Sequence, residues 1–275
     1  MADAITRIIS DVHYGDRSSR VRSLAQLRPL GAGVATLVLN GDTLDTRTGP
    51  FPERTARSRA ELTEFFAGFG PAVTFVTGNH DPDISLHHAL ELAGGRVLVT
   101  HGDVLFDAIV PWSSDAGRFR AGMRAGLAAL APAERHNFEA RLALARRVAA
   151  SVPQRHHANP DRLKYAVGFL ADTVWPPWRG LAILHTWLVL PGRAAELARR
   201  HRPKAKFVLT GHIHRPGVWR RGADGVVVVN TGSFCRPLGG YVVDLTSDRL
   251  TVRRIEVRQG DFHPGGVVAE FSLGG

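Results

Sequence analysis

The chain has 275 residues, of which 44% are hydrophobic and 22% are charged, a balance typical of folded globular proteins and unlike that of disordered chains. Its single cysteine, Cys235, excludes an intramolecular disulfide and any site built from several thiolates. The net charge of +10 favours anionic partners such as nucleotides, nucleic acid or an anionic membrane surface. A GC-rich genome that places arginine at solvated positions would produce the same charge, so charge alone selects no partner.

Two features of the sequence bear on the compartment. The first residues lack a basic head followed by an apolar core, and no apolar run reaches the roughly 18 residues needed to span a bilayer. A single cysteine is in keeping with a reducing environment. We therefore expect a cytoplasmic protein.

In the first hundred residues, short β-branched runs alternate with helix-like stretches. Strands are predicted at 5–10, 34–39, 72–77 and 96–100, and helices at 54–69 and 85–93. Strands that alternate with helices predict a parallel sheet built from βαβ units. We therefore expect an α/β fold.

The residue composition and the predicted elements change in the second half of the chain. Residues 111–202 are rich in alanine, arginine and leucine and contain no predicted strand, which indicates a helical insertion. Strands are predicted again at 207–210, 225–230, 241–245 and 250–257, close enough together for an antiparallel or mixed second sheet. The glycine-rich tail, 260–275, carries no predicted element. The expected division is a core of 1–110 and 203–275 with a helical cap of 111–202.

Polar clusters follow five of the predicted strands. They are Ser10-Asp-Val-His13, Asn40-Gly-Asp-Thr-Leu-Asp45, Gly78-Asn-His-Asp81, Thr100-His-Gly-Asp103 and Gly211-His-Ile-His214. One such cluster alone is usually a turn. In open α/β sheets, however, binding sites form beyond the carboxyl ends of the strands, so five clusters in this position should converge on one crevice.

The clusters supply oxygen and nitrogen donors without sulfur, a set that suits manganese, iron or zinc. The seven candidate ligands are Asp11, His13, Asp42, Asn79, His101, His212 and His214. Seven donors are too many for one ion, and they fit two ions about 3.5–4 Å apart. If the backbone around Ile213 is extended, the histidines on either side of it lie on one face. A hydrogen-bonded surface role is the alternative for that pair alone.

The ordered motifs resemble the signature of the calcineurin-like metallophosphoesterases. They are Asp-x-His, Gly-Asp-x-x-Asp, Gly-Asn-His-Asp, His-Gly-Asp and Gly-His-x-His, spread over residues 11–214. The resemblance implies a four-layer α/β/β/α sandwich with a dinuclear site at one edge of the paired sheets. It assigns one ion to Asp11, His13, Asp42 and His214, and the other to Asp42, Asn79, His101 and His212. Manganese is the expected metal, with iron or zinc as alternatives.

The same resemblance implies a reaction and two further roles. Two cations would lower the pKa of a bridging water, and the metal-bound hydroxide would attack a phosphodiester or pyrophosphate in line. His80 would sit over the reacting phosphate as a catalytic residue, and Asp45 would orient it. A carboxylate beside an imidazole favours the protonated ring, as a group that stabilises negative charge or protonates a leaving oxygen requires. The alternative for Asp45 is a simple capping role.

The substrate is a narrower question. The insertion and the run Thr210-Gly-His-Ile-His-Arg-Pro216 most resemble the UDP-2,3-diacylglucosamine pyrophosphatases of lipid A biosynthesis, which hold acyl chains under a helical cap. The apolar, tryptophan-rich stretch 174–190 suits an amphipathic lipid or peripheral contact with the inner membrane face. A helix packed inside the cap would have the same composition.

The catalytic positions depart from that group, which typically carries arginine where this chain has His80 and another residue where it has Asp45. The pair is closer to phosphodiesterases and to repair nucleases. The alternative functions are therefore a manganese-dependent nuclease or a general cyclic or small phosphodiesterase. A non-enzymatic scaffold is disfavoured. A family member that had lost its activity would be expected to lack some metal ligands, whereas all seven positions are filled here.

Overall fold

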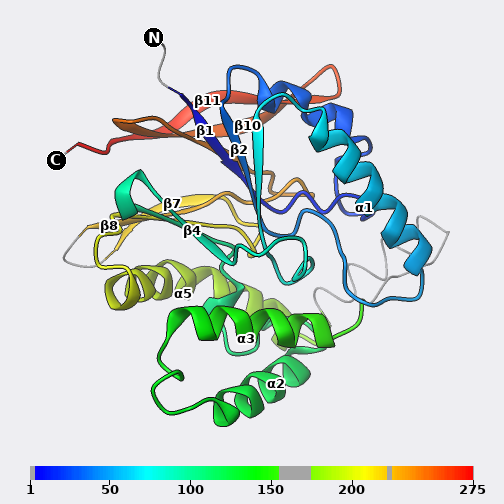
Figure 1. Ribbon diagram of the computed structural model, residues 1–275, viewed down its shortest axis with the longest axis vertical. Coiled ribbons are helices and arrows are strands. Elements are labelled where there is room, and N and C mark those ends of the chain that lie inside the picture. Colours follow the sequence, from blue (N-terminus) through cyan, green and yellow to red (C-terminus); the bar gives the residue numbers. More distant parts are fainter. Residues whose placement is uncertain (1–3, 155–174, 222–224, 275) are drawn as a thin grey trace.

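Two β-sheets lie face to face, and helices cover the outer face of each (Figure 1). This computed structural model describes residues 4–154, 175–221 and 225–274. The predicted α/β/β/α sandwich is confirmed, with apolar clusters between each pair of layers. No helix among the described residues is long and apolar enough to cross a membrane.

The first sheet has the strand order β11-β10-β9-β1-β2-β3. Its strands are β1 (Thr6–Ile9), β2 (Thr36–Asn40), β3 (Ala72–Val76), β9 (Tyr241–Leu245), β10 (Arg249–Arg258) and β11 (Asp261–Ser272). β1 and β3 both run parallel to β2, which confirms the predicted parallel unit. β9 pairs antiparallel with β1, and β10 and β11 continue the sheet. The predicted strands at 241–245 and 250–257 therefore extend the first sheet and do not join the second.

The second sheet has the order β4-β5-β6-β8-β7. Its strands are β4 (Ala89–Leu92), β5 (Val97–Thr100), β6 (Phe207–Thr210), β7 (Gly217–Arg221) and β8 (Val226–Asn230). β5, β6 and β8 are parallel, and the edge strands β4 and β7 are antiparallel to their neighbours. Since β5 pairs with β6, a strand that precedes the insertion and one that follows it lie side by side.

One predicted element is wrong, and two strands have no predicted counterpart. The predicted helix at 85–93 is instead β4, whose Ala, Leu and Glu residues are good helix formers but pair with β5. The tail without a predicted element forms the 12-residue strand β11, paired along β10. β7 has no predicted counterpart. In each case the pairing partner, rather than local propensity, decides the conformation.

Helices and short 3-10 turns complete the layers. They are η1 (Leu24–Gly31), α1 (Pro52–Ala67), η2 (Ala93–Gly95), η3 (Asp103–Leu105), α2 (Ala116–Ala129), α3 (Phe138–Ser151) and α5 (Trp178–His201). α1 begins with Pro52, whose missing N–H costs nothing at that position. α3 begins at a cap in which the Asn137 side chain accepts a hydrogen bond from the Ala140 amide.

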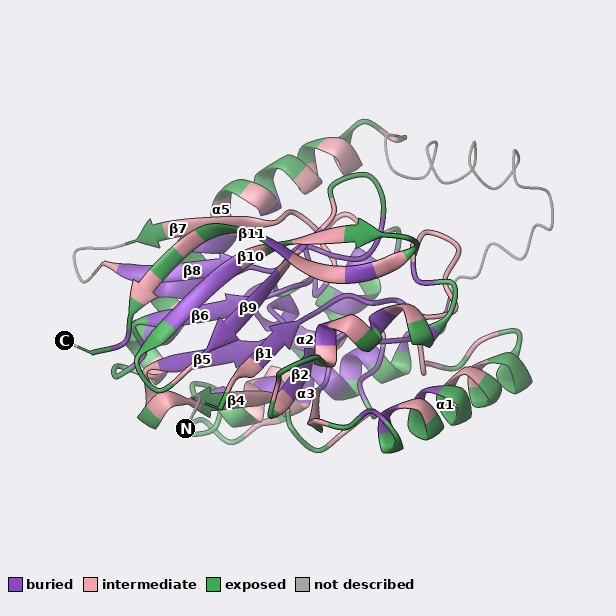
Figure 2. Ribbon diagram, turned by 90° about the horizontal axis from the view of Figure 1, so that it is seen from above, coloured by how far each residue is buried: buried purple, intermediate pink, exposed green. Residues whose placement is uncertain are grey.

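Apolar packing places the helices of the insertion. Ala145 of α3 and Ala194 of α5 share one buried cluster with Leu98 of β5 and Val208 of β6, on the outer face of the second sheet. Figure 2 shows the strands largely buried, while α1 and α5 each keep an exposed face. The helices of the insertion therefore supply the fourth layer of the sandwich. The division at residues 111 and 202 into core and cap stays a prediction.

Candidate metal centre

The loops that follow β1, β2 and β3 are joined by backbone hydrogen bonds. The Asp11 amide donates to the Gly41 carbonyl over 3.0 Å, and the His13 amide donates to the Asp42 carbonyl over 2.9 Å. The His80 amide donates to Asp42 Oδ1 over 2.8 Å. Three of the predicted clusters therefore lie together at the carboxyl edge of the first sheet.

The loops of the second sheet join the same edge. The Gly211 amide donates to the His101 carbonyl over 2.9 Å, which holds the loops after β5 and β6 together. The His212 amide donates to Asp11 Oδ2 over 3.0 Å and so links the two sheets. All five predicted clusters meet in one place, while the role of each residue stays a prediction.

The backbone at these loops is left-handed at five candidate ligands. The φ angles are 52° at Asp11, 49° at His13, 53° at Asp42, 72° at His212 and 55° at His214. The extended backbone expected around Ile213 is therefore wrong. The side chain of Ile213 is nevertheless packed, because it is buried and belongs to the same apolar cluster as Leu98 and Val208. Its carbonyl accepts a hydrogen bond from Trp187 Nε1 over 3.0 Å. A left-handed non-glycine residue costs about 1–3 kcal/mol and is typical of functional sites.

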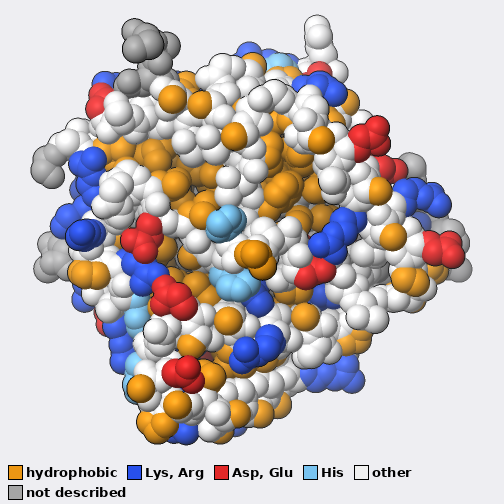
Figure 3. All heavy atoms as spheres, in the orientation of Figure 1, with side chains coloured by type: hydrophobic (Ala, Val, Ile, Leu, Met, Phe, Trp, Pro, Cys, Tyr) orange, Lys and Arg blue, Asp and Glu red, His pale blue; other side chains and the backbone are white. Residues whose placement is uncertain are grey.

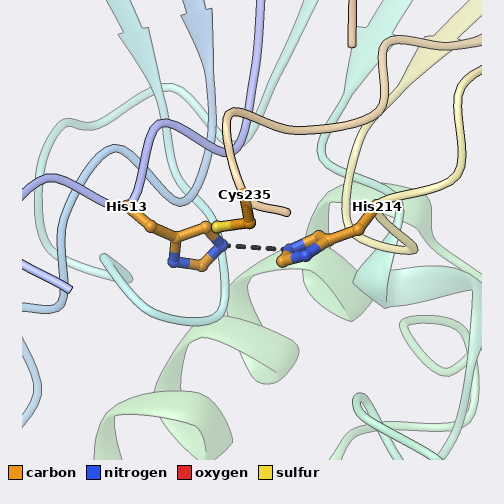
Figure 4. A group of neighbouring side chains, drawn as sticks. All are labelled: His13, His214 and Cys235. Carbon is orange, nitrogen blue, oxygen red and sulfur yellow. Dashed lines mark hydrogen bonds between the residues drawn. The ribbon is translucent and has the colours of Figure 1, made fainter. Parts of the chain in front are cut away.

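The first group of donors surrounds His13. Its Nε2 lies 3.1 Å from His214 Nε2 (Figure 4) and 3.8 Å from both Asp11 Oδ1 and Asp42 Oδ2. His214 Nε2 lies 3.3 Å from Asp11 Oδ1. These are the four residues that the family resemblance assigns to one ion.

The second group surrounds His101, whose tautomer follows from its contacts. Nδ1 donates to the Asn40 carbonyl over 3.0 Å, so Nε2 is the nitrogen that a cation would take once it replaces any proton there. That nitrogen lies 3.3 Å from Asp42 Oδ2 but has no hydrogen-bond partner, and neither has the buried Asn79 Oδ1. His212 Nε2 lies 2.9 Å from the Ile109 carbonyl, which leaves Nδ1 as the lone-pair atom.

These orphaned atoms test whether the residues fit a cation. Buried polar atoms are almost always paired. Among the described residues that carry an unpaired buried side-chain atom, His101 and Asn79 are candidate ligands of the site, and their free atoms, Nε2 and Oδ1, are both suitable metal ligands. Asp42, His101 and His212 offer donor atoms that all lie within 4.8 Å of one another. The donor set therefore fits a divalent cation.

The charges of the site differ between its histidines. Burial would lower the pKa of His101, but Asp42 and Asp11 raise it to about 10, so this ring is protonated beside Asp42, and a cation would replace its proton. Burial lowers the pKa of His13 and of His212 to about 4, so both imidazoles are neutral at pH 7 and can act as ligands. Burial alone would raise the pKa of Asp42, but His101 and His80 hold it well below its usual value. A buried carboxylate of this kind needs positive charge beside it.

The predicted catalytic pair is formed, with a third member that the motifs do not include. His80 Nδ1 lies 2.8 Å from Asp45 Oδ2, and its ring is 5.1 Å from that of His13. Arg47 donates to both oxygens of Asp45, over 3.0 and 2.6 Å, and its Nη2 is 3.0 Å from His80 Nδ1. Arg47 follows Asp45 by two residues, and only the turn of the loop brings its guanidinium back.

Asp81 is a second residue whose role the motif does not reveal. Its carboxylate accepts hydrogen bonds from the amides of Asp42, Thr43 and Gly78 over 2.9, 2.7 and 2.7 Å. A Cβ at Gly78 would collide with the carboxylates of Asp42 and Asp81. Asp81 therefore holds the loops after β2 and β3 in register, and Gly78 permits their close approach.

A groove opens from the metal centre toward α1. Its lining combines basic, hydroxyl and aromatic side chains with members of the site: His13, Tyr14, Gly15, Asp16, Leu44, Asp45, Phe51, Arg54, Thr55 and Ser58. Arg54 donates to the Gly15 carbonyl over 2.6 Å, which fixes its guanidinium over the groove wall. The groove therefore places a guanidinium, hydroxyl groups and aromatic rings beside the metal centre.

Comparison with known proteins relates the chain to one protein family and to several solved structures. Residues 6–216 match the family described as calcineurin-like phosphoesterase. A search of curated protein sequences found no match. Among solved structures, the chain is similar to a dimetal phosphatase from Danio rerio, at 14% identity over 98% of both chains with a TM-score of 0.46. It is also similar to Vacuolar Protein Sorting 29 from Cryptosporidium parvum, at 13% identity over 98% of both chains with a TM-score of 0.45.

A third similar structure is a predicted phosphoesterase from Streptococcus pneumoniae, at 16% identity over 99% of both chains with a TM-score of 0.39. These likenesses are distant, and the assignment rests on the family match, which covers most of the chain and every candidate ligand. The chain belongs to the calcineurin-like phosphoesterase family.

Proposed function

We propose that the protein is a dinuclear metal-dependent phosphohydrolase that cleaves a phosphodiester or a pyrophosphate. The observation that carries the proposal is the pair of buried donor atoms without partners, His101 Nε2 and Asn79 Oδ1, beside the carboxylate of Asp42. The family match supports a phosphoester as the substrate. Manganese remains the expected metal, with iron or zinc as alternatives.

In this proposal the two groups of donors hold one cation each, and Asp42 bridges them. The first cation is held by Asp11, His13, Asp42 and His214, and the second by Asp42, Asn79, His101 and His212. When bound, the cations would supply an activated water and a clamp for the phosphoryl oxygens. The hydrogen bonds from His101 Nδ1 and His212 Nε2 to backbone carbonyls orient both rings toward this task.

His80 and Asp45 would act on the substrate side. Burial and Arg47 lower the pKa of His80, but Asp42 and Asp45 outweigh them and raise it above its usual value. The protonated ring can donate to a phosphoryl oxygen or to the leaving oxygen. Arg47 holds the Asp45 carboxylate in a bidentate grip, so the pair is held in place before the substrate arrives.

The finer proposal is a lipid-linked nucleotide such as UDP-2,3-diacylglucosamine. α5 and the residue run before it expose an unusual number of large apolar side chains: Trp175, Trp178, Leu181, Leu184 and Leu188. Val174, the first residue of the predicted apolar stretch, lies outside the described residues. An acyl chain or the inner membrane face would cover such a surface.

A small phosphodiester, cyclic or linear, is the second candidate. The hydrogen-bonded pair of His80 and Asp45 favours it, since this pair is the point at which the chain departs from the lipid A enzymes. A nuclease is the third candidate. On the face shown in Figure 3, the Lys and Arg side chains of the described residues are interspersed with Asp and Glu.

The test is metal-dependent hydrolysis of bis-p-nitrophenyl phosphate. Asp42→Asn and His212→Ala should each abolish activity, while Asp248→Asn, an exposed carboxylate remote from the site, should retain it. Full activity in either site variant would refute the proposal. Mass spectrometry of products from UDP-2,3-diacylglucosamine, nucleotides, simple diesters and DNA then selects the substrate.

A further inference from the structure

Cys235, the single cysteine of the chain, lies beside the first group of donors. It is in the loop after β8, is 3% exposed, and points its sulfur toward His13 and His214 (Figure 4). Sγ and one nitrogen of each histidine all lie within 4.8 Å of one another. The five sequence motifs end at His214 and do not include this residue, which lies 222 positions after His13.

The loop that carries Cys235 is anchored at the metal centre. The Phe234 amide donates to the Asp11 carbonyl over 3.1 Å, so the neighbouring residue is bonded to a candidate ligand. Cys235 forms an isolated β-bridge with Ser19, and its amide donates to Ser233 Oγ over 3.1 Å. Backbone contacts on both sides therefore set the position of the sulfur.

The hydrogen bonds show where the thiol proton lies. Ser18 Oγ donates its one proton to Asp16 Oδ1 over 2.8 Å, so the contact of 3.3 Å between Ser18 Oγ and Cys235 Sγ requires the thiol to donate. The sulfur keeps its lone pairs for a ligand on the side of His13 and His214.

The separations allow Cys235 to join the four residues proposed for the first cation as a fifth ligand, a coordination number that zinc can adopt. Two imidazole nitrogens 3.1 Å apart, each at about 2.1 Å from a cation, would subtend an angle of about 95° at it. A zinc ion lies about 2.3 Å from a thiolate sulfur, so nitrogen and sulfur ligands of one ion are about 3.6 Å apart when the angle at the ion is tetrahedral. From the observed limit of 4.8 Å, the sulfur and nitrogen atoms would close by at most about 1.2 Å on binding.

We propose that Cys235 is a thiolate ligand of the cation held by His13 and His214, and that it makes this position prefer zinc over manganese. Soft thiolate ligands select zinc, whereas manganese prefers oxygen donors. Binding forms a Zn–S bond, breaks the S–H bond and releases the proton to solvent. The inference rests on the proposed metal centre and assigns different metal preferences to its two positions.

Zinc K-edge absorption spectroscopy of the zinc-loaded protein tests the inference. The expected result for the unmodified chain is one sulfur neighbour for every two zinc ions at about 2.3 Å, replaced by nitrogen and oxygen neighbours alone in Cys235→Ser. Ser18→Ala, which keeps the thiol and removes only its acceptor, should retain the sulfur shell. Substitution with cobalt(II) should give a thiolate charge-transfer band in the near ultraviolet that Cys235→Ser lacks.

Metal competition supplies a second readout without activity. Cys235→Ser should lower the preference of the first position for zinc over manganese by more than about tenfold. Removal of a residue that only hydrogen-bonds to a metal ligand already costs about tenfold in metal affinity, and loss of a ligand should cost more. A spectrum with two bound zinc ions and no sulfur shell overturns this inference and leaves the phosphohydrolase proposal standing. Failure of the unmodified chain to bind any divalent cation overturns both.

Discussion

The buried ion pair between Arg146 and Asp103 leads to the most quantitative prediction. Arg146 of α3 contacts both carboxylate oxygens of Asp103, which begins η3 two residues after His101. The side chains are 5% and 0% exposed. Burial alone would raise the pKa of Asp103, but Arg146, together with His101 and His212, lowers it below its usual value. The pair joins the insertion to a loop of the metal centre.

Arg146→Met removes one partner and leaves the other charge buried. Loss of one member of a fully buried ion pair costs about 3–5 kcal/mol, which for a chain of this size lowers the melting temperature by roughly 10 °C. The double variant Arg146→Met/Asp103→Leu removes both charges and should recover most of the loss, because apolar replacements of a buried pair are often neutral.

The same helix offers a matched control. Arg141 of α3 pairs with Asp107 just after η3 over 2.6 Å, but these side chains are 28% and 69% exposed. A surface pair contributes about 0–1 kcal/mol, so Arg141→Met should change stability little. Thermal unfolding followed by circular dichroism in chelator measures all variants without the contribution of bound metal. A loss below about 1 kcal/mol in Arg146→Met, or an equal loss in the double variant, would refute the reasoning.

Three further predictions concern the site itself. His80→Ala should lower kcat by about 10²–10⁴ while elemental analysis finds the metal content unchanged; loss of both metals would make His80 a ligand instead. Arg47→Ala should lower kcat more than it raises KM, with only partial recovery in Arg47→Lys, because a lysine cannot reproduce the bidentate grip on Asp45; equal rates in all three proteins would exclude this positioning role. Gly78→Ala should lower metal content, because its Cβ would displace the Asp42 carboxylate, whereas Gly117→Ala, with open space around the added Cβ, should not; normal loading of both variants would contradict the steric argument.

Local chemistry makes part of the site readable from the sequence. The donors of each cluster are close in the chain and follow strand patterns, and the carboxyl ends of strands in an α/β sandwich meet at one edge. The seven candidate ligands could therefore be named before the structure, and the family resemblance added the pair of Asp45 and His80. The alternation of short β-branched runs with helix-like stretches likewise predicts the parallel pairing of β1, β2 and β3.

Tertiary structure decides what depends on partners distant in the chain. β4 and β11 become strands because β5 and β10 pair with them, against local helix propensity in one case and glycine content in the other. The loop after β6 is held in its left-handed backbone at His212 and His214 by two tertiary hydrogen bonds. The His212 amide donates to Asp11, and Trp187 donates to the Ile213 carbonyl.

The sequence by itself determined the chemical nature of this site: which donors are present, the order in which they occur and the strands they follow. Only the tertiary structure brought Cys235 next to His13, turned Arg47 back onto Asp45 and left His101 Nε2 without a partner. The physical reason is that ligand identity is a property of single side chains. Distance, burial and hydrogen-bond satisfaction belong to pairs of residues that only the folded chain brings together.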